Sequence, residues 1–181
     1  LSNAELAFYT SWFYLPWVIK PFWSPFVDAL KTKRWWILAM QILIGAGFAG
    51  VAFTISTSFW LQASIAFFWL IAFSSATHDI AADGFYMLGL NQNKQAEFVG
   101  IRSTFYRLSS IFGQGVLVAL AGLIDRNTAD VHLAWKITLL VSAVIFAAVT
   151  LYHTWSLPRP SGDTMSSTMT AKDILREFGR T

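Results

Sequence analysis

The sequence contains no cysteine, and only 13% of its 181 residues are charged. The absence of cysteine excludes disulfide bonds and thiolate metal sites in this chain. An ordinary soluble domain carries roughly 25% charged residues, so the low charge content argues against a soluble protein. Hydrophobic residues make up 55% and aromatic residues 17% of the chain, and its mean hydropathy is +0.51. This composition is typical of an integral membrane protein.

Several sequence signals of other protein classes are also missing. The 13 basic residues lie between apolar stretches and form no run of the kind that binds nucleic acid. No glycine-rich loop with a lysine is present to cradle phosphates, and no nucleophile, base and oxyanion arrangement is visible. The three histidines lack the further ligands that a metal site needs. We therefore expect neither an enzyme nor a cofactor, a metal or a nucleic-acid partner.

Five apolar segments are long enough to cross a bilayer, which takes about 20 residues. They are residues 6–27, 35–54, 59–88, 99–124 and 133–155. The remaining residues, 156–181, are polar, begin as a Pro, Gly and Ser-rich stretch and end in a short amphipathic candidate helix. We expect an all-α membrane bundle over residues 1–155 and a cytoplasmic linker over residues 156–181.

The basic residues outside the segments indicate how the chain is oriented, because cytoplasmic loops are enriched in Lys and Arg. Arg126 and Lys136 lie on one side of the membrane. The larger group lies on the other side and consists of Lys31, Lys33, Arg34, Lys94, Arg159, Lys172, Arg176 and Arg180. This places the linker in the cytoplasm and the N-terminus of the chain outside.

Charged side chains interrupt the third segment, which begins as an apolar run and then carries His78, Asp79 and Asp83. Asp79 and Asp83 are four residues apart and share one face of a helix, which Ser75 and Tyr86 extend. Ionisable residues inside a membrane usually face a cavity and mark a path for ions or substrates. The alternative is that these carboxylates only pair with basic residues and hold the bundle together.

Two basic residues lie at a comparable depth in neighbouring segments. Lys20 lies among the prolines of the first segment, which predict a kinked or partly unwound helix. Arg107 belongs to a polar stripe of the fourth segment that continues to Gln114. Each is about 12 Å from the cytoplasmic end, between the depths of the two aspartates. We expect Lys20, Asp79, Asp83 and Arg107 to form one charge cluster around a cavity, and we place His132 and His153 at the two membrane interfaces.

Three stretches together resemble a known family. They are LPWVIKPFWSPFVD with the basic loop that follows it, SSATHDIAADGFYMLGL, and EFVGIRSTFYRLSSIFGQG. They are similar to the muropeptide permease and acetyl-CoA transporter branch of the major facilitator superfamily, and the similarity reaches to about Pro160. The resemblance implies helices two to six of an N-terminal six-helix bundle. It also implies that the first helix and the C-terminal half of the same protein are missing from this sequence.

The resemblance also implies an activity. It suggests a transporter of the inner (plasma) membrane that imports a muropeptide-like or sugar-derived solute together with protons, by alternating access. The resemblance matches Asp79, Asp83 and Arg107 to pathway residues of the family, and it matches Asp28, Lys31, Lys33 and Arg34 to a gating loop. The full set of residues that we expect to line the pathway is Lys20, His78, Asp79, Asp83, Arg107 and Gln114. The loop is shorter than the usual glycine-rich version, and His78 replaces a polar amide. The alternatives are a transporter of another solute and a non-transporting sensor or scaffold with the same fold.

Overall fold

The computed structural model of the chain describes residues 2–164, and all regular structure in that range is helical. Four helices are long and apolar enough to cross a membrane. They are α4 (Lys33–Thr54), α5 (Trp60–Gly89), the continuous stretch Gln92–Thr128, and α8 (Val131–Ser156). The third consists of α6 (Gln92–Ile111), a π-helical turn η2 (Phe112–Val116) and α7 (Leu117–Thr128). The prediction of an all-α membrane protein is confirmed.

The proline-containing N-terminal segment is divided into short pieces. Its elements are α1 (Asn3–Trp12), α2 (Leu15–Val18), the 3-10 turn η1 (Lys20–Phe22) and α3 (Ser24–Leu30). Pro16, Pro21 and Pro25 each lie at the first or second position of one of these pieces. Proline is tolerated there because an N–H group in the first turn of a helix has no acceptor within that helix, so its absence loses no hydrogen bond. The predicted unwinding is thus confirmed, and no single helix spans residues 6–27.

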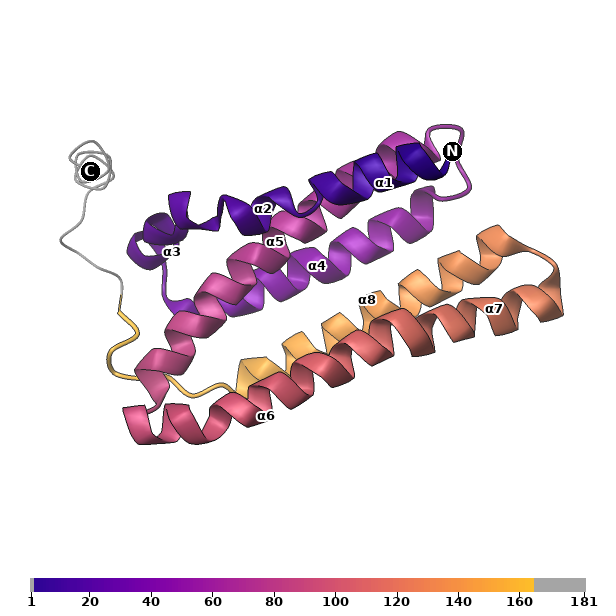
Figure 1. The fold of residues 1–181 in the computed structure, drawn as a ribbon. Coiled ribbons are helices and arrows are strands. Elements are labelled where there is room, and N and C mark those ends of the chain that lie inside the picture. Colours follow the sequence, from indigo (N-terminus) through magenta and orange to yellow (C-terminus); the bar gives the residue numbers. More distant parts are fainter. Residues whose placement is uncertain (1, 165–181) are drawn as a thin grey trace.

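Helix α4 lies between α5 and α8 and packs against both (Figure 1). Glycines allow the close approach to α5. A Cβ atom added to Gly47 would lie 2.5 Å from Cγ1 of Ile71, and one added to Gly50 would lie 2.4 Å from Cε1 of Phe67. Small residues at helix contacts are common in membranes because they let backbones pack closely. The broken segment packs on α5 through α2 and α3, and α7 packs on α8.

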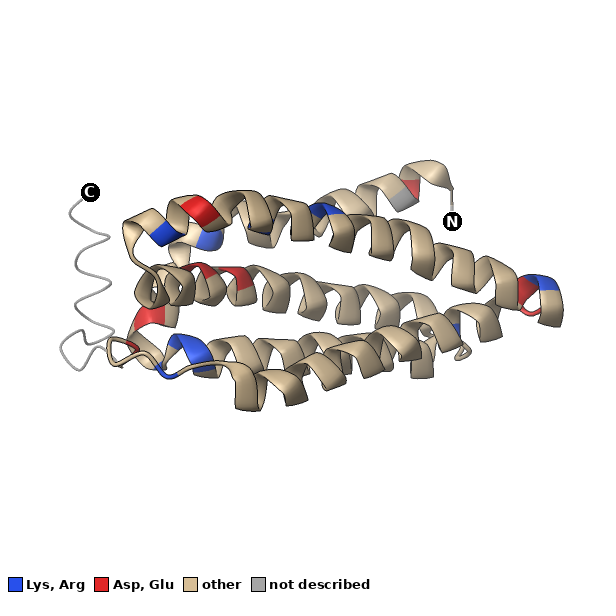
Figure 2. Ribbon diagram, turned by 90° about the horizontal axis from the view of Figure 1, so that it is seen from below, with Lys and Arg blue, Asp and Glu red and all other residues tan. Residues whose placement is uncertain are grey.

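The end of the bundle at which α4 begins and α5 and α8 end is called the linker end below. Figure 2 shows that most charged residues lie toward this end and that the central lengths of the helices are largely uncharged. An apolar cluster of Val27, Ile37, Ile80 and Ala81 joins α3, α4 and α5 near the same end. Leu157, from the chain after α8, packs against it. This cluster fixes α3 beside the polar residues of α5.

Candidate functional site

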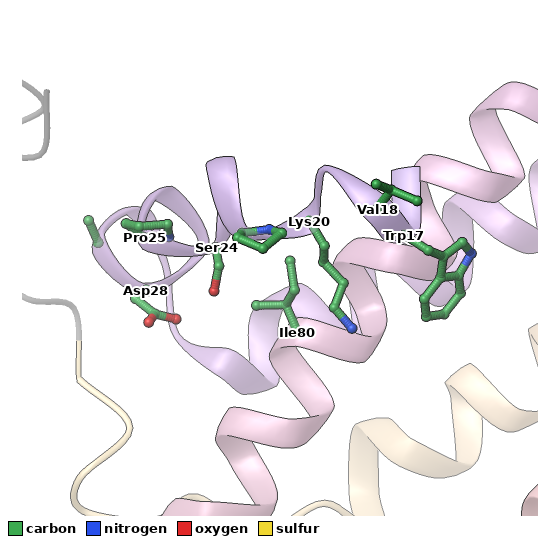
Figure 3. Close-up of a pocket in the computed structure, with 9 residues that line it drawn as sticks. Trp17, Val18, Lys20, Ser24, Pro25, Asp28 and Ile80 are labelled. Atoms are coloured by element: carbon green, nitrogen blue, oxygen red, sulfur yellow. The ribbon is translucent and has the colours of Figure 1, made fainter. Parts of the chain in front are cut away.

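The ammonium group of Lys20 and the carboxylate of Asp79 form an ion pair between the broken segment and α5. Both side chains are partly buried, with exposed fractions of 25% and 36%. Lys20 begins the turn η1, where the helix is interrupted, and its Nζ lies 5.1 Å from the ring centroid of Trp17. In Figure 3 the Lys20 side chain extends from the broken segment toward α5. The pair therefore joins the unwound backbone to the polar face of α5.

A cavity of about 730 Å³ opens beside this pair. It combines an aromatic ring, an ammonium group, a hydroxyl and a carboxylate with apolar side chains (Figure 3). Its lining residues are Trp17, Val18, Lys20, Pro21, Ser24, Pro25, Asp28, Ala29 and Ile80. Ligand sites of comparable volume are mostly apolar with a few placed polar groups. The lining of this cavity has the same character, with a few polar groups among apolar side chains.

Asp83 pairs with Arg102, not with Arg107. The Arg102 guanidinium also lies 4.7 Å from the ring centroid of Tyr86, whose hydroxyl donates to the carbonyl oxygen of Gln95 at 2.5 Å. Asp83 and Arg102 are thus tied to the turn between α5 and α6. The expected single cluster of four charges is wrong: two separate ion pairs form instead. Helical depth placed Arg107 near the aspartates but could not show which way its side chain leaves α6.

Arg107 is exposed and has no ion-pair or hydrogen-bond partner within residues 2–164. It lines a shallow hollow on α6 together with Val99, Arg102, Ser103 and Tyr106. Gln114 is exposed in the π-helical turn that follows α6. Such turns interrupt the regular hydrogen-bond ladder and often occur at functional sites. The structure does not bring either residue to Asp79.

A third polar contact joins three helices and was missed by the sequence analysis. The Nε2 atom of Gln41 on α4 lies 3.2 Å from Nε2 of His78 on α5 and 2.9 Å from Nδ1 of His153 on α8. Gln41 is buried, with 4% of its surface exposed. The prediction that His153 is only interfacial is therefore incomplete, since its ring reaches the interior. A lone glutamine in a glycine-rich helix gives no sequence signal of such a contact.

The loop after α3 is linked to the chain that follows α8. Asp28 pairs with Lys33, while Lys31 lies over the ring of Trp35 at 6.0 Å. The Arg34 guanidinium donates to the carbonyl oxygens of Thr154 at 2.5 Å and Leu157 at 3.3 Å. Of the four predicted loop residues, Asp28 and Lys33 therefore pair with each other, Lys31 contacts Trp35, and Arg34 binds the end of α8.

Asp163 completes this connection. Its carboxylate accepts the backbone N–H groups of Lys33 at 2.6 Å and Arg34 at 3.0 Å. Thr32 accepts the next two N–H groups of α4, from Trp35 and Trp36. The N–H groups of Lys33, Arg34 and Trp35, which have no acceptor within the helix, are therefore all paired, and the bond from Trp36 is the first regular bond of the helix. Asp163 also brings a negative charge to the positive end of the helix dipole. An aspartate in a polar stretch gave no sequence signal of this role.

Within the described part of the chain no group of three or more His, Cys, Asp or Glu residues could hold a metal ion. Neither a curated protein nor a solved structure matches the chain. The model of the BT1 family matches residues 1–171, which is nearly the whole sequence. This family is one of membrane transporters within the major facilitator superfamily. The match covers well over half of the sequence and agrees with four helices that are long and apolar enough to cross a membrane, and the chain belongs to the BT1 family.

Proposed function

We propose that the protein is a proton-coupled importer of a muropeptide-like or sugar-derived solute and that Asp79 is its principal proton site. The Lys20–Asp79 ion pair carries this proposal. The pair lies within the helical bundle, next to a cavity and at a break in a helix. Carboxylates in such positions commonly bind transported protons, and broken helices commonly form the binding sites of transporters.

The ion pair offers a simple way to link a proton to the shape of the bundle. When Asp79 is charged, it holds Lys20 and therefore the η1 turn against α5. A proton on Asp79 removes the charge that attracts Lys20, because a neutral carboxyl group leaves the ammonium group without a counter-ion. The broken segment is then free to move relative to α5. Proton binding and opening of the cavity are thus two aspects of one event.

The chemistry of the cavity supports a sugar-derived solute. Trp17 presents an aromatic face, and Ser24 and Lys20 supply a hydroxyl and a cationic donor on the same wall. Aromatic rings stack on the apolar faces of sugars, while an ammonium group binds a carboxylate or phosphate substituent. Anhydromuropeptides combine both features. The sequence resemblance to muropeptide permeases points to the same class of solute.

We propose an inner-membrane location with the linker end in the cytoplasm. The support is the concentration of Lys and Arg near this end, which the positive-inside rule assigns to the cytoplasmic face. Asp28, Lys33, Arg34 and Asp163 join the α3–α4 loop to the chain after α8. We assign this connection to the gate on the cytoplasmic side of the cavity.

Uptake of labelled anhydromuropeptide into vesicles containing the intact protein tests the proposal. Vesicles with an imposed inward proton gradient should accumulate the label, and vesicles without it should only equilibrate. The Asp79→Asn variant should lose accumulation, whereas Glu97→Gln, which changes an exposed acid, should keep it. If the gradient drives uptake of another solute and no muropeptide is taken up, the proposed substrate class is wrong. No gradient dependence for any solute would overturn proton coupling.

A further inference from the structure

The cavity beside the broken segment has a cationic end and an anionic end. Among residues 2–164, the charged side chains that line it are Lys20 and Asp28. Figure 3 shows them on opposite sides of Ser24, with the Lys20 side chain directed toward α5. Trp17 lies beside Lys20, whose Nζ atom is 5.1 Å from the centroid of the ring. An ammonium group and an aromatic face therefore meet at one end of the cavity.

The counter-ion of Lys20 comes from α5. Its ammonium group pairs with Asp79, and within the described part of the chain no second carboxylate pairs with it. The Lys20 side chain is only 25% exposed, so its charge depends on a nearby anion for compensation. A change in the charge of Asp79 therefore acts directly on Lys20.

The other carboxylates near this pair have cations of their own. Asp28 on α3 pairs with Lys33, and Asp83 on α5 pairs with Arg102. Moving either carboxylate to Lys20 would leave another cation without its partner. The protein therefore has no spare carboxylate among these residues to replace Asp79.

The remaining elements packed against the pair supply no anion either. His78 precedes Asp79 on α5, and its Nε2 atom lies 3.2 Å from the amide nitrogen of Gln41. Helix α2, which packs on both η1 and α5, has no titratable side chain. A replacement for Asp79 must therefore come from a molecule that enters the cavity.

We infer that a carboxylate of the transported solute replaces Asp79 as the counter-ion of Lys20 when Asp79 takes up a proton. The inference rests on the proposed function, in which Asp79 is the proton site, and it narrows the solute to an acid. The charges balance in this exchange. Before it, the ammonium group faces a charged Asp79, and after it the same group faces the carboxylate of the solute beside a neutral Asp79. One proton and one anionic group therefore enter together without net charge.

The exchange makes the site selective for anions. A carboxylate forms a charge-assisted hydrogen bond with an ammonium group, whereas a neutral solute of the same shape leaves the ammonium group uncompensated. By linkage, an anion that prefers the protonated site also favours proton binding to Asp79 by the same factor. The proton gradient therefore drives uptake of the acid and not of its neutral analogue.

The Asp79→Asn variant reproduces the neutral side chain, and acetate is a probe that presents only a carboxylate. Thermal unfolding of the intact protein in detergent is measured in chloride-free buffer with sodium acetate, or with the same concentration of its neutral isostere acetamide. Acetate should raise the unfolding midpoint of Asp79→Asn by about 2 °C relative to acetamide. In the wild type, Lys20 already has its counter-ion, and the shift should equal the general salt effect measured with Lys20→Gln.

The double variant Lys20→Gln with Asp79→Asn is the matched control, because it lacks both charges. Its midpoint should shift no more than that of Lys20→Gln. An equal acetate shift in Asp79→Asn and the double variant would overturn the inference, because the anion would then bind elsewhere. The absence of an acetate shift in Asp79→Asn would also overturn it. If Asp79→Asn is unfolded in acetamide, the yield of folded protein replaces the midpoint: a higher yield in acetate supports the inference, and equal yields contradict it.

This test depends neither on the transported solute nor on a gradient. If acetate stabilises Asp79→Asn through Lys20 but anhydromuropeptide is not taken up, the proposed substrate is wrong and the exchange of counter-ions stands. If a proton gradient drives uptake but acetate has no effect on Asp79→Asn, proton coupling stands and the exchange is wrong.

Discussion

Lys20 and Asp79 are 59 positions apart in the chain and form an ion pair that joins the interrupted N-terminal segment to α5. The pair is partly buried, so each charge depends on the other for compensation. Removing one partner leaves an uncompensated charge in surroundings where water is scarce. Removing both leaves two neutral groups. This asymmetry makes the pair open to a direct energetic test.

We expect Lys20→Gln and Asp79→Asn each to lower the free energy of unfolding by roughly 1 to 3 kcal/mol. The double variant should lose less than the sum of the two, because neither charge is then left alone. Denaturant titration of the intact protein in detergent, followed by tryptophan fluorescence, measures these changes.

The exposed pair Lys94–Glu97, with its charged atoms 3.8 Å apart, provides the matched control. Neutralising either of its members should change stability by less than about 1 kcal/mol. Strict additivity of the Lys20 and Asp79 variants would show that the two residues do not interact.

The partner of Asp83 distinguishes the structure from the sequence-based expectation. Exchanging the charges of Asp83 and Arg102 by Asp83→Arg with Arg102→Asp should restore the yield of folded protein that Asp83→Arg alone loses, because the pair is re-formed in reverse. Size-exclusion chromatography of the detergent-solubilised protein reports the folded fraction.

Asp83→Arg combined with Arg107→Asp is the control for this exchange. Arg107 has no ion-pair partner among residues 2–164, so reversing its charge should give no recovery. Recovery with Arg107 and not with Arg102 would contradict the assigned pairing.

The contact between α4 and α5 depends on the absence of a side chain at Gly50. Gly50→Ala would place a methyl group 2.4 Å from the ring of Phe67, so the helices must separate or the ring must shift. We expect a loss of about 1 to 3 kcal/mol of stability. Gly122→Ala, on the open surface of α7, should be neutral or stabilising by up to about 1 kcal/mol. Thermal unfolding measures the midpoint temperatures of both variants. Equal midpoints for Gly50→Ala and Gly122→Ala would contradict the close packing at Gly50.

Asp163 holds the chain after α8 against the start of α4. Asp163→Ala removes both acceptors and should cost about 1 kcal/mol, as the loss of a helix cap typically does. It should also speed proteolytic cleavage of the linker. Asp163→Asn retains one acceptor oxygen, so its stability and its cleavage rate should lie between those of the wild type and Asp163→Ala. Limited proteolysis followed by mass spectrometry measures the effect, and unchanged cleavage in Asp163→Ala would contradict the contact.

Hydrophobicity and proline spacing predicted the helices well, because both act locally along the chain. The polar face of α5 could also be predicted from a local pattern, because Asp79 and Asp83 are one helical turn apart. Side-chain pairing was harder to predict. Arg102 and Arg107 both lie on α6, and the sequence did not show which of the two reaches Asp83. Gln41 and Asp163 carry no periodic pattern, because their partners lie far away in the sequence.

The central claim is that Asp79 couples solute movement to a proton. The most direct measurement compares two activities of the intact protein in liposomes, accumulation driven by a proton gradient and exchange of labelled for unlabelled solute without a gradient. Exchange requires a folded protein and an intact solute site, but no net proton movement. We predict that Asp79→Asn abolishes accumulation and retains exchange. Accumulation at the wild-type level in Asp79→Asn would contradict the claim.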